Sequence, residues 1–208
     1  MRADSAPMSP SHTEFDWAER YRGEDTPWDL GGPHPELELR IADGRFAPPR
    51  AGARALVPGC GRSYDAFALA GAGWDVVGVD YVTALQTWLP ERYAEHGARF
   101  VLGDALAFRD DEPFDLIWDH TFFCAIHPHS REAYGQLARD QIVPGGHFVS
   151  LVFPANKGKE LGGPPYGFDA EVLQETLGPD FTLTEDVDPE RRVGRRKWWE
   201  RVASYERS

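Results

Sequence analysis

The stretch RALVPGCGRSYDAFALAGAGWDVVGVD, residues 54–80, decides the fold. It opens with a short apolar run, residues 54–58, of the kind that forms a strand buried on both faces of a parallel sheet. Gly59-Cys60-Gly61 follows as a tight turn. Glycine permits positive φ and has no Cβ, so a ligand can approach the main chain at this turn.

A helix and a second strand complete the stretch. Ser63 is placed to cap a helix over residues 64–71, and another apolar run, residues 74–79, ends at Asp80. The unit is therefore β-α-β, and its crossover is expected to be right-handed. An acid at the end of the second strand of such a unit is where a nucleoside cofactor presents its ribose hydroxyls.

Three interpretations of this unit remain open at this point. A dinucleotide fingerprint requires G-x-G-x-x-G, but Tyr64 occupies the position of the third glycine. An S-adenosylmethionine site also uses a glycine turn and a ribose-binding acid, and it needs no third glycine because this cofactor has no pyrophosphate. In the third interpretation the turn is purely structural and Asp80 is an exposed side chain.

The composition narrows the class of protein. The 208 residues fit one domain with a single core, and the two cysteines, Cys60 and Cys124, suit a reducing cytoplasm better than a disulfide framework. No secretion signal opens the chain, and no apolar run approaches membrane-spanning length. A net charge of −12 would repel a phosphate backbone. We expect a cytoplasmic protein without nucleic-acid or membrane partners, for which a monomer suffices.

Aromatic residues gather before the first strand. Residues 1–12 are expected to be a disordered tail, and residues 13–208 a single domain. A short helix starting at a Ser or Thr cap is predicted from four residues at helical spacing, Phe15, Trp17, Ala18 and Tyr21. A turn-rich segment containing Trp28 follows. These aromatics are either core residues or a lid across the carboxyl edge of the sheet, where open α/β sheets bind ligands.

The remaining chain alternates helices and strands. Further helices are expected over residues 35–44, 84–95 (kinked or divided by Pro90), 131–140, and after an Asp169 cap through residue 177. Further strands are expected over residues 100–102, 114–118, 147–153, 181–187 and 197–205, with a turn at residues 144–146. The last two strands should form an antiparallel hairpin, with the basic run Arg191–Lys197 on a solvated loop between them.

This layout predicts an α/β, Rossmann-like class I methyltransferase fold. Its sheet would be mostly parallel and seven-stranded, with a C-terminal antiparallel hairpin and an N-terminal helical lid. Three acids, Asp80, Asp104 and Asp119, follow or end consecutive strands. Because parallel strands end at one edge of a sheet, we expect these carboxylates to lie along that edge.

On these residues the sequence resembles the thiopurine S-methyltransferase superfamily, which includes the plant and microbial halide and thiol methyltransferases. The resemblance is carried by WAERYRGEDTPWDL (17–30), residues 54–80, FDLIWDHTFFCAIHPHSR (114–131), PGGHFVSLVFP (144–154) and GPPY (163–166). It covers nearly the whole chain after residue 13. It implies an S-adenosylmethionine-dependent enzyme that moves a methyl group to a small soft nucleophile, such as a thiol, thiocyanate, a halide or a related chalcogen compound, and leaves S-adenosylhomocysteine.

The resemblance also implies a set of cofactor-binding residues. They are Trp17, Tyr21, Trp28, Gly59, Asp80, Asp104, Ala105 and His120. Asp80 would accept from the ribose hydroxyls, Asp104 or the Ala105 amide would meet the adenine, and the aromatic rings would pack on the sulfonium. The chain departs from its relatives at Arg62, where they carry glycine or a small residue, and at His120, where they carry Tyr or Arg.

Methyl transfer from a sulfonium is an in-line displacement, so no catalytic triad and no metal is required. The protein has to align the reactants and exclude water. A thiol acceptor must be presented as thiolate, and Arg131 or a protonated His120 would lower its pKa. Tyr166, Phe122 and Phe153 are candidates for the acceptor wall, and residues 154–167 form a loop long enough to be a lid.

Two other functions remain open from the sequence. One is a nicotinamide-dependent oxidoreductase, which Tyr64 weakens because it replaces the third fingerprint glycine. The other is a non-catalytic protein that binds S-adenosylmethionine on the same fold.

Overall fold

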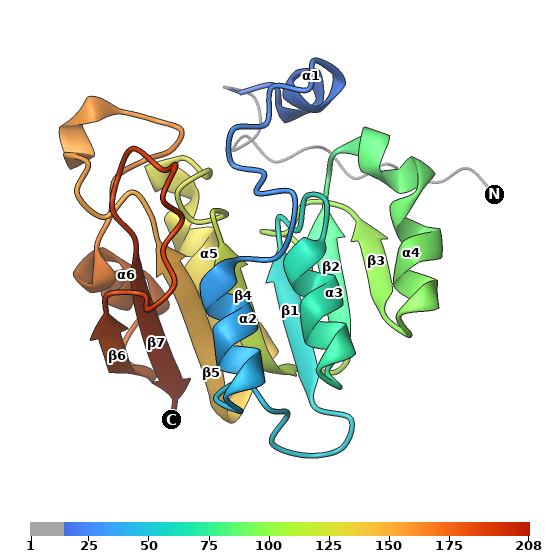
Figure 1. Ribbon diagram of the computed structural model, residues 1–208. Helices are drawn as coiled ribbons and strands as arrows, with labels where there is room; N and C mark the ends of the chain where they lie inside the picture. Colours follow the sequence, from blue (N-terminus) through green and yellow to red (C-terminus); the bar gives the residue numbers. More distant parts are fainter. Residues whose placement is uncertain (1–14) are drawn as a thin grey trace.

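Strand β1 (Arg54–Pro58) lies inside a seven-stranded sheet, and every residue of the strand is buried (Figure 1). The structure is a computed structural model that describes residues 15–208. The strand order is β3-β2-β1-β4-β5-β7-β6. The other strands are β2 (Asp75–Asp80), β3 (Arg99–Leu102), β4 (Phe114–His120), β5 (Ile142–Val152), β6 (Phe181–Val187) and β7 (Arg201–Arg207). Strands β1 to β5 pair in parallel, and β7 runs antiparallel between β5 and β6. The predicted α/β Rossmann-like fold with its terminal hairpin is confirmed.

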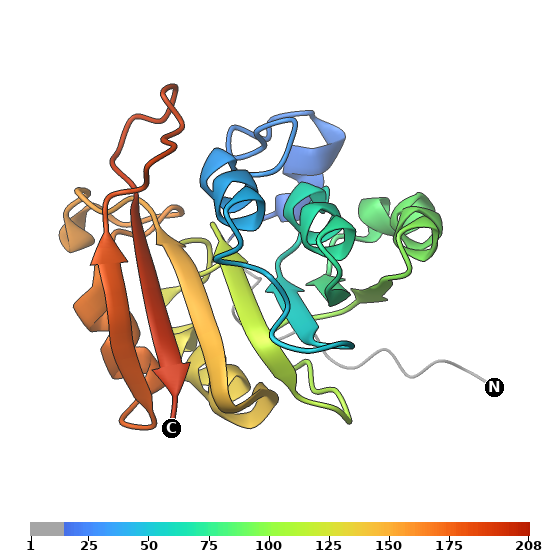
Figure 2. The same ribbon diagram turned by 60° about the horizontal axis from the view of Figure 1, so that its bottom comes forward.

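Helices cover both faces of this sheet. They are α1 (Trp17–Arg22), α2 (Pro35–Ala42), α3 (Tyr64–Gly71), α4 (Leu89–Glu95), α5 (Arg131–Gln141) and α6 (Ala170–Leu177), with short 3₁₀ turns at η2 (Thr83–Thr87), η3 (Pro128–Ser130) and η4 (Lys159–Leu161). Helices α2, α3 and α4 lie on one face and α5 and α6 on the other, each group over its own apolar core cluster (Figures 1 and 2). Helix α1 lies beyond the carboxyl ends of the strands (Figure 1).

Two strand boundaries differ from the prediction. Strand β5 begins at Ile142 rather than at His147, because the predicted turn Pro144-Gly145-Gly146 lies inside the strand as a bulge. Phe114 faces Ile142 and Leu116 faces His147, so two steps along β4 span five along β5. Strand β7 begins at Arg201, not at Lys197. The residues before Arg201 belong instead to the connection from β6.

The helix signals were only partly correct. Asp169 caps α6, as expected, by accepting from the Val172 N–H at 2.9 Å. Ser63 precedes α3, but at φ 66° its side chain makes no cap hydrogen bond, because the turn places this residue in the left-handed region. Asp16, rather than a Ser or Thr, caps α1; Thr13 and the predicted tail lie outside the described residues. The chain does divide near Pro90, which sits in the first turn of α4.

Candidate functional site

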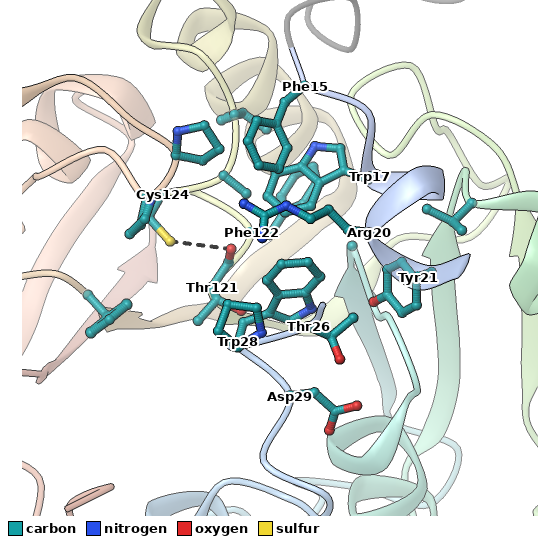
Figure 3. A pocket seen from close by; sticks show the side chains of 18 of the residues that line it. Phe15, Trp17, Arg20, Tyr21, Thr26, Trp28, Asp29, Thr121, Phe122 and Cys124 are labelled. Carbon is teal, nitrogen blue, oxygen red and sulfur yellow. Dashed lines mark hydrogen bonds between the residues drawn. The ribbon is translucent and has the colours of Figure 1, made fainter. Parts of the chain in front are cut away.

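A cavity of about 660 Å³ lies at the carboxyl edge of the sheet, between the N-terminal segment and the loops after β1, β2 and β4 (Figure 3). Its size is in the range of small-molecule sites, about 300–1,000 Å³. Most of its large side chains are aromatic: Phe15, Trp17, Tyr21, Trp28, Tyr81, Phe122, Phe153 and Trp198. The cavity is therefore suited to a ligand with apolar and cationic parts.

The glycine turn after β1 forms one wall of this site and has no room for side chains. Gly59 has φ 57°, and a Cβ there would lie 2.2 Å from Cδ2 of Phe122. Gly61 has φ 52°, and a Cβ there would lie 2.6 Å from the Tyr21 hydroxyl. The positive φ that the turn suggested is confirmed at both glycines. Gly59 lines the cavity, and the Phe122 ring fills the space that a side chain at this position would need.

Asp80 lies at the end of β2 and holds this turn in place. Its Oδ2 accepts from the Gly61 N–H at 2.9 Å and its Oδ1 accepts from the Val82 N–H at 3.0 Å. The carboxylate is 7% exposed and lines the cavity. Burial, followed by the negative charge of Asp80, raises the pKa of Tyr21 above its ordinary value, so this phenol stays neutral. An ionised carboxylate is a hydrogen-bond acceptor, the type of group that hydroxyls bind.

The N-terminal aromatic residues form a lid over the cavity, and Trp17 and Tyr21 also pack against one of the two core clusters. Trp17, Tyr21 and Trp28 are each only partly buried and all line the cavity (Figure 3). The Trp28 ring meets Trp17 edge-on at a centroid distance of 5.1 Å and Tyr21 at 5.8 Å. These contacts join the turn-rich segment to α1, so the two close the site together.

Asp29 fastens this lid to the rest of the molecule. Its Oδ2 forms an ion pair with Nε of Arg62 at 2.7 Å, and its backbone carbonyl accepts from Nη2 of Arg195 at 2.5 Å. Arg62 belongs to the glycine turn, whereas Arg195 belongs to the connection between β6 and β7. One residue thus ties the lid to both sides of the cavity.

The three acids at the sheet edge have different environments. Asp80 lines the cavity, whereas Asp104 and Asp119 are not among the described residues that line it. Asp119 is 1% exposed and accepts from the N–H groups of Phe122 and Phe123 and from the Tyr134 hydroxyl. Burial raises its pKa to about 6. Asp119 therefore shapes the turn that presents Phe122, and Asp104 accepts from the Leu106 N–H beside Ala105, which does line the cavity.

The three candidate catalytic residues lie outside this set of lining residues. His120 borders a smaller recess beside the glycine turn, and both of its ring nitrogens have partners. The Arg131 guanidinium stacks over Phe123 at 4.6 Å, and burial lowers its pKa. Tyr166 donates its backbone N–H to the Cys124 carbonyl at 2.7 Å. Among the described residues, none of the three lines the large cavity.

Three cations that line the cavity come from the basic run that the sequence placed on a solvated loop, and another, Arg20, comes from α1. Arg195, Arg196 and Lys197 all line the cavity, and the Arg196 side chain is only 6% exposed. The run lies on the connection between β6 and β7, and Arg195 and Lys197 are exposed, as predicted, so the solvated-loop prediction is wrong only for Arg196. The topology could have predicted the position of this run. Strand β6 runs in the same direction as β1–β5, so the connection from β6 to β7 lies at the carboxyl edge of the sheet, beside the cavity.

Cys124 also lines the cavity but is not prepared for nucleophilic chemistry. Its thiol donates to the Thr121 carbonyl at 3.4 Å (Figure 3). Burial, followed by the charge of Asp119, raises its pKa to about 12. The thiol therefore stays protonated, and thiolate is the nucleophilic form.

The β-α-β unit, the glycine turn, the acid at the end of β2 and the aromatic cavity together define a class I methyltransferase. Comparison with known proteins agrees. The family described as Thiopurine S-methyltransferase (TPMT) matches residues 12–203. The chain therefore belongs to the thiopurine S-methyltransferase family and is an S-adenosylmethionine-dependent methyltransferase.

Individual relatives and structures support this assignment. Probable thiol methyltransferase 2 of Arabidopsis thaliana is 34% identical, across 92% of this chain and 84% of that protein. Thiocyanate methyltransferase 1 of the same plant is 36% identical, across 80% and 72%. The N-methyltransferase NodS of Bradyrhizobium japonicum, crystallised with S-adenosyl-L-homocysteine, has the same fold with a TM-score of 0.70 at 20% identity, across 91% and 96%. Among residues 15–208, no helix is long and apolar enough to span a membrane.

Proposed function

We propose that the acceptor is a small soft nucleophile, namely a thiolate, thiocyanate, a halide or a related chalcogen anion. The observation that carries this proposal is the aromatic cavity with Arg195, Arg196 and Lys197 on its lining. Cations in a partly desolvated site favour an anionic acceptor. Relatives named thiol and thiocyanate methyltransferases support the same acceptor class.

We assign the cofactor to the glycine-turn side of the cavity. S-adenosylmethionine supplies a methyl group already activated by its sulfonium. The residues suit it, because Gly59, the Asp80 carboxylate and the small residue Ala105 all line this part of the cavity, and a carboxylate is the type of group that accepts from ribose hydroxyls. Trp17, Tyr21 and Trp28 would face the sulfonium and exclude water. Asp104 would act on this site through the segment that it holds, whereas His120 lies outside this cavity and is not assigned to the cofactor.

The proposed acceptor chemistry needs alignment more than proton transfer. Thiocyanate and halides are anions already, whereas a thiol with a pKa of about 8.5 has to be stabilised as thiolate. We assign this stabilisation to Arg196 and its cationic neighbours, which line the cavity, in place of Arg131 and protonated His120. Phe122 and Phe153 would form the acceptor wall and hold the nucleophile in line.

A panel of acceptors tests the proposal. Thiocyanate, iodide, hydrosulfide, aromatic thiols, and selenium and tellurium oxyanions are incubated with the protein and S-adenosylmethionine, and methylated products are identified by mass. We expect turnover of at least one soft anion, with a stoichiometric amount of S-adenosylhomocysteine. Cofactor binding without transfer to any member, or transfer only to oxygen or nitrogen acceptors, would overturn the proposed acceptor class.

Asp80→Ala tests the cofactor assignment. The variant removes the carboxylate from the cavity, and we expect S-adenosylhomocysteine to bind about 10- to 100-fold more weakly, as is usual for losing hydrogen bonds to a charged group. Asp75→Ala is the matched control, because Asp75 lies at the opposite end of the same strand and is exposed. Calorimetry measures both variants, and equal affinities for the two would refute the assignment.

A further inference from the structure

A buried polar network lies beneath the acceptor side of the cavity. It contains His34, Asp65, His120, Arg196 and Glu200, and each of these side chains is at most 13% exposed. The five residues come from the start of α2, from α3, from the end of β4 and from the connection between β6 and β7. Arg196 is the one member among the described residues that also lines the large cavity.

The Arg196 guanidinium has partners on three sides. Its Nη1 forms an ion pair with Glu200, its Nη2 lies 2.7 Å from Nε2 of His120, and its Cζ lies 4.6 Å from the centre of the Phe153 ring. A guanidinium has five N–H donors in a planar fork, and these two polar contacts use two of them. The fork is thus oriented by the protein and retains donors for the cavity that it lines.

His120 can accept from Arg196 only in one protonation form. Its Nδ1 lies 2.7 Å from Oδ2 of Asp65, a carboxylate that also accepts from the Trp118 indole and the His34 backbone N–H. A carboxylate is an acceptor, so Nδ1 carries the hydrogen. Arginine has no acceptor, so Nε2 must present its lone pair. The contacts therefore define a neutral Nδ1–H tautomer that links Asp65 to Arg196.

Glu200 is held just as firmly on the other side. It accepts from Nε2 of His34 at 3.3 Å and from the Val193 N–H at 3.2 Å, while Nδ1 of His34 accepts from the Glu36 N–H at 3.1 Å. Burial raises the pKa of Glu200, but the hydrogen bond from His34 and the charge of Arg196 outweigh it and lower the pKa to about 2. Glu200 is consequently an anion over the whole working range of pH.

We propose that Glu200 and His120 are positioning residues that fix the Arg196 fork against Phe153, so that its remaining donors bind an anionic acceptor. This inference rests on the proposed function of the site and goes beyond it, because it assigns acceptor affinity to side chains that touch neither substrate. A free arginine loses substantial rotamer freedom when it binds an anion, whereas a preoriented fork loses little. Neither histidine of the network acts as an acid or a base.

Equilibrium binding of thiocyanate to the complex with S-adenosylhomocysteine tests the proposal without requiring turnover. We expect Glu200→Gln and His120→Leu to weaken thiocyanate binding about tenfold while cofactor affinity changes less than about twofold, because the orienting contacts are lost. In steady state the same variants should raise KM for thiocyanate and change kcat little. His120→Gln keeps an acceptor oxygen and should recover part of the affinity.

Glu185→Gln is the control for a merely structural effect. Glu185 pairs with buried Arg40 away from the cavity, so its loss should lower stability and leave thiocyanate affinity unchanged. Should Glu200→Gln not fold, Arg196→Lys keeps the charge but loses the fork, and the same weakening is expected. Wild-type affinity in these variants, or no thiocyanate binding by the wild type, would overturn the inference. Thiocyanate binding without methylation would instead count against the proposed function.

Discussion

Gly59 is a position in the cavity wall where even a single methyl group would collide with a neighbouring side chain. A Cβ there would overlap the Phe122 ring. The backbone N–H of Phe122 donates to the Asp119 carboxylate, and this hydrogen bond fixes the position of Phe122. Asp119 is in turn bonded to Tyr134 in the core. The ring therefore cannot move without disturbing a buried carboxylate, and the wall of the cavity depends on glycine at position 59.

We predict that Gly59→Ala weakens S-adenosylhomocysteine binding by about tenfold or more and destabilises the fold by about 1–3 kcal/mol, because the new methyl group overpacks against Phe122. Gly52→Ala is the control. Gly52 also has positive φ, at 70°, but no atom lies within 4 Å of its added Cβ, so only backbone strain of about 1–2 kcal/mol is expected. Calorimetry and urea unfolding separate the two effects. Undiminished cofactor affinity in Gly59→Ala would contradict the prediction.

Among the elements, the lid is fastened by side chains, not by a sheet or helix ladder. Helix α1 has only six residues and no buried residue, so it has little stability of its own. Its position depends on Trp28 and on the two contacts of Asp29 with Arg62 and Arg195. Figure 1 shows α1 and the connection between β6 and β7 on the same side of the sheet, at the carboxyl ends of the strands. The two sides of the cavity are thus joined through one acidic residue.

We predict that Arg62→Ala speeds release of S-adenosylhomocysteine about two- to fivefold, the size expected for a partly exposed ion pair of less than about 1 kcal/mol. The difference from wild type should shrink as salt rises, because salt screens the pair. Stopped-flow displacement measures the rate. Arg92→Ala removes an exposed pair with Glu95 on α4 and should leave release unchanged. Equal release rates for Arg62→Ala and wild type at low salt would show that the Asp29–Arg62 ion pair does not hold the lid closed.

Across the whole molecule, buried carboxylates make stability depend on pH with opposing signs. Folding lowers the pKa of Glu200 from 4.5 to about 2. The contribution of Glu200 to the unfolding free energy is therefore complete above pH 4.5 and is lost as the pH falls toward 2. Asp65 behaves in the same way from 3.8 to about 2: burial raises its pKa, but the hydrogen bonds that it accepts from His120, Trp118 and the His34 N–H outweigh burial. The pKa of Asp119 rises from 3.8 to about 6, so its ionisation destabilises the fold as pH rises through that window.

We predict that Glu200→Gln reduces the loss of unfolding free energy between pH 7 and pH 3 by about 1–2 kcal/mol, because part of the shift of this buried group lies in that window. Urea unfolding of wild type and variant at both pH values measures the difference. Glu132→Gln, which alters an exposed carboxylate, should retain the wild-type dependence. An unchanged pH dependence in Glu200→Gln would show that Glu200 is not coupled to folding.

Residues 54–80 alone were sufficient to predict the central unit of the fold. A buried strand, a glycine turn and a helix are each specified within a few neighbouring residues, so β1, α3 and the position of Asp80 at the end of β2 were predicted correctly. Boundaries failed where distant pairing overrides local preference. Strand β5 absorbs Pro144 as a bulge because β4 and β7 pair along both of its edges.

The sequence by itself determined the fold and the family resemblance, since those features depend on short-range patterns. Only the tertiary structure decided which residues of the basic run line the cavity. Arg196 meets His120 across 76 positions, and His34 meets Glu200 across 166. The spacing of neighbouring residues in the sequence cannot predict a contact between residues so far apart. It exists because β6 and β7 return the chain to the edge where β1, β2 and β4 end, and the Arg196 side chain is buried there beside Glu200.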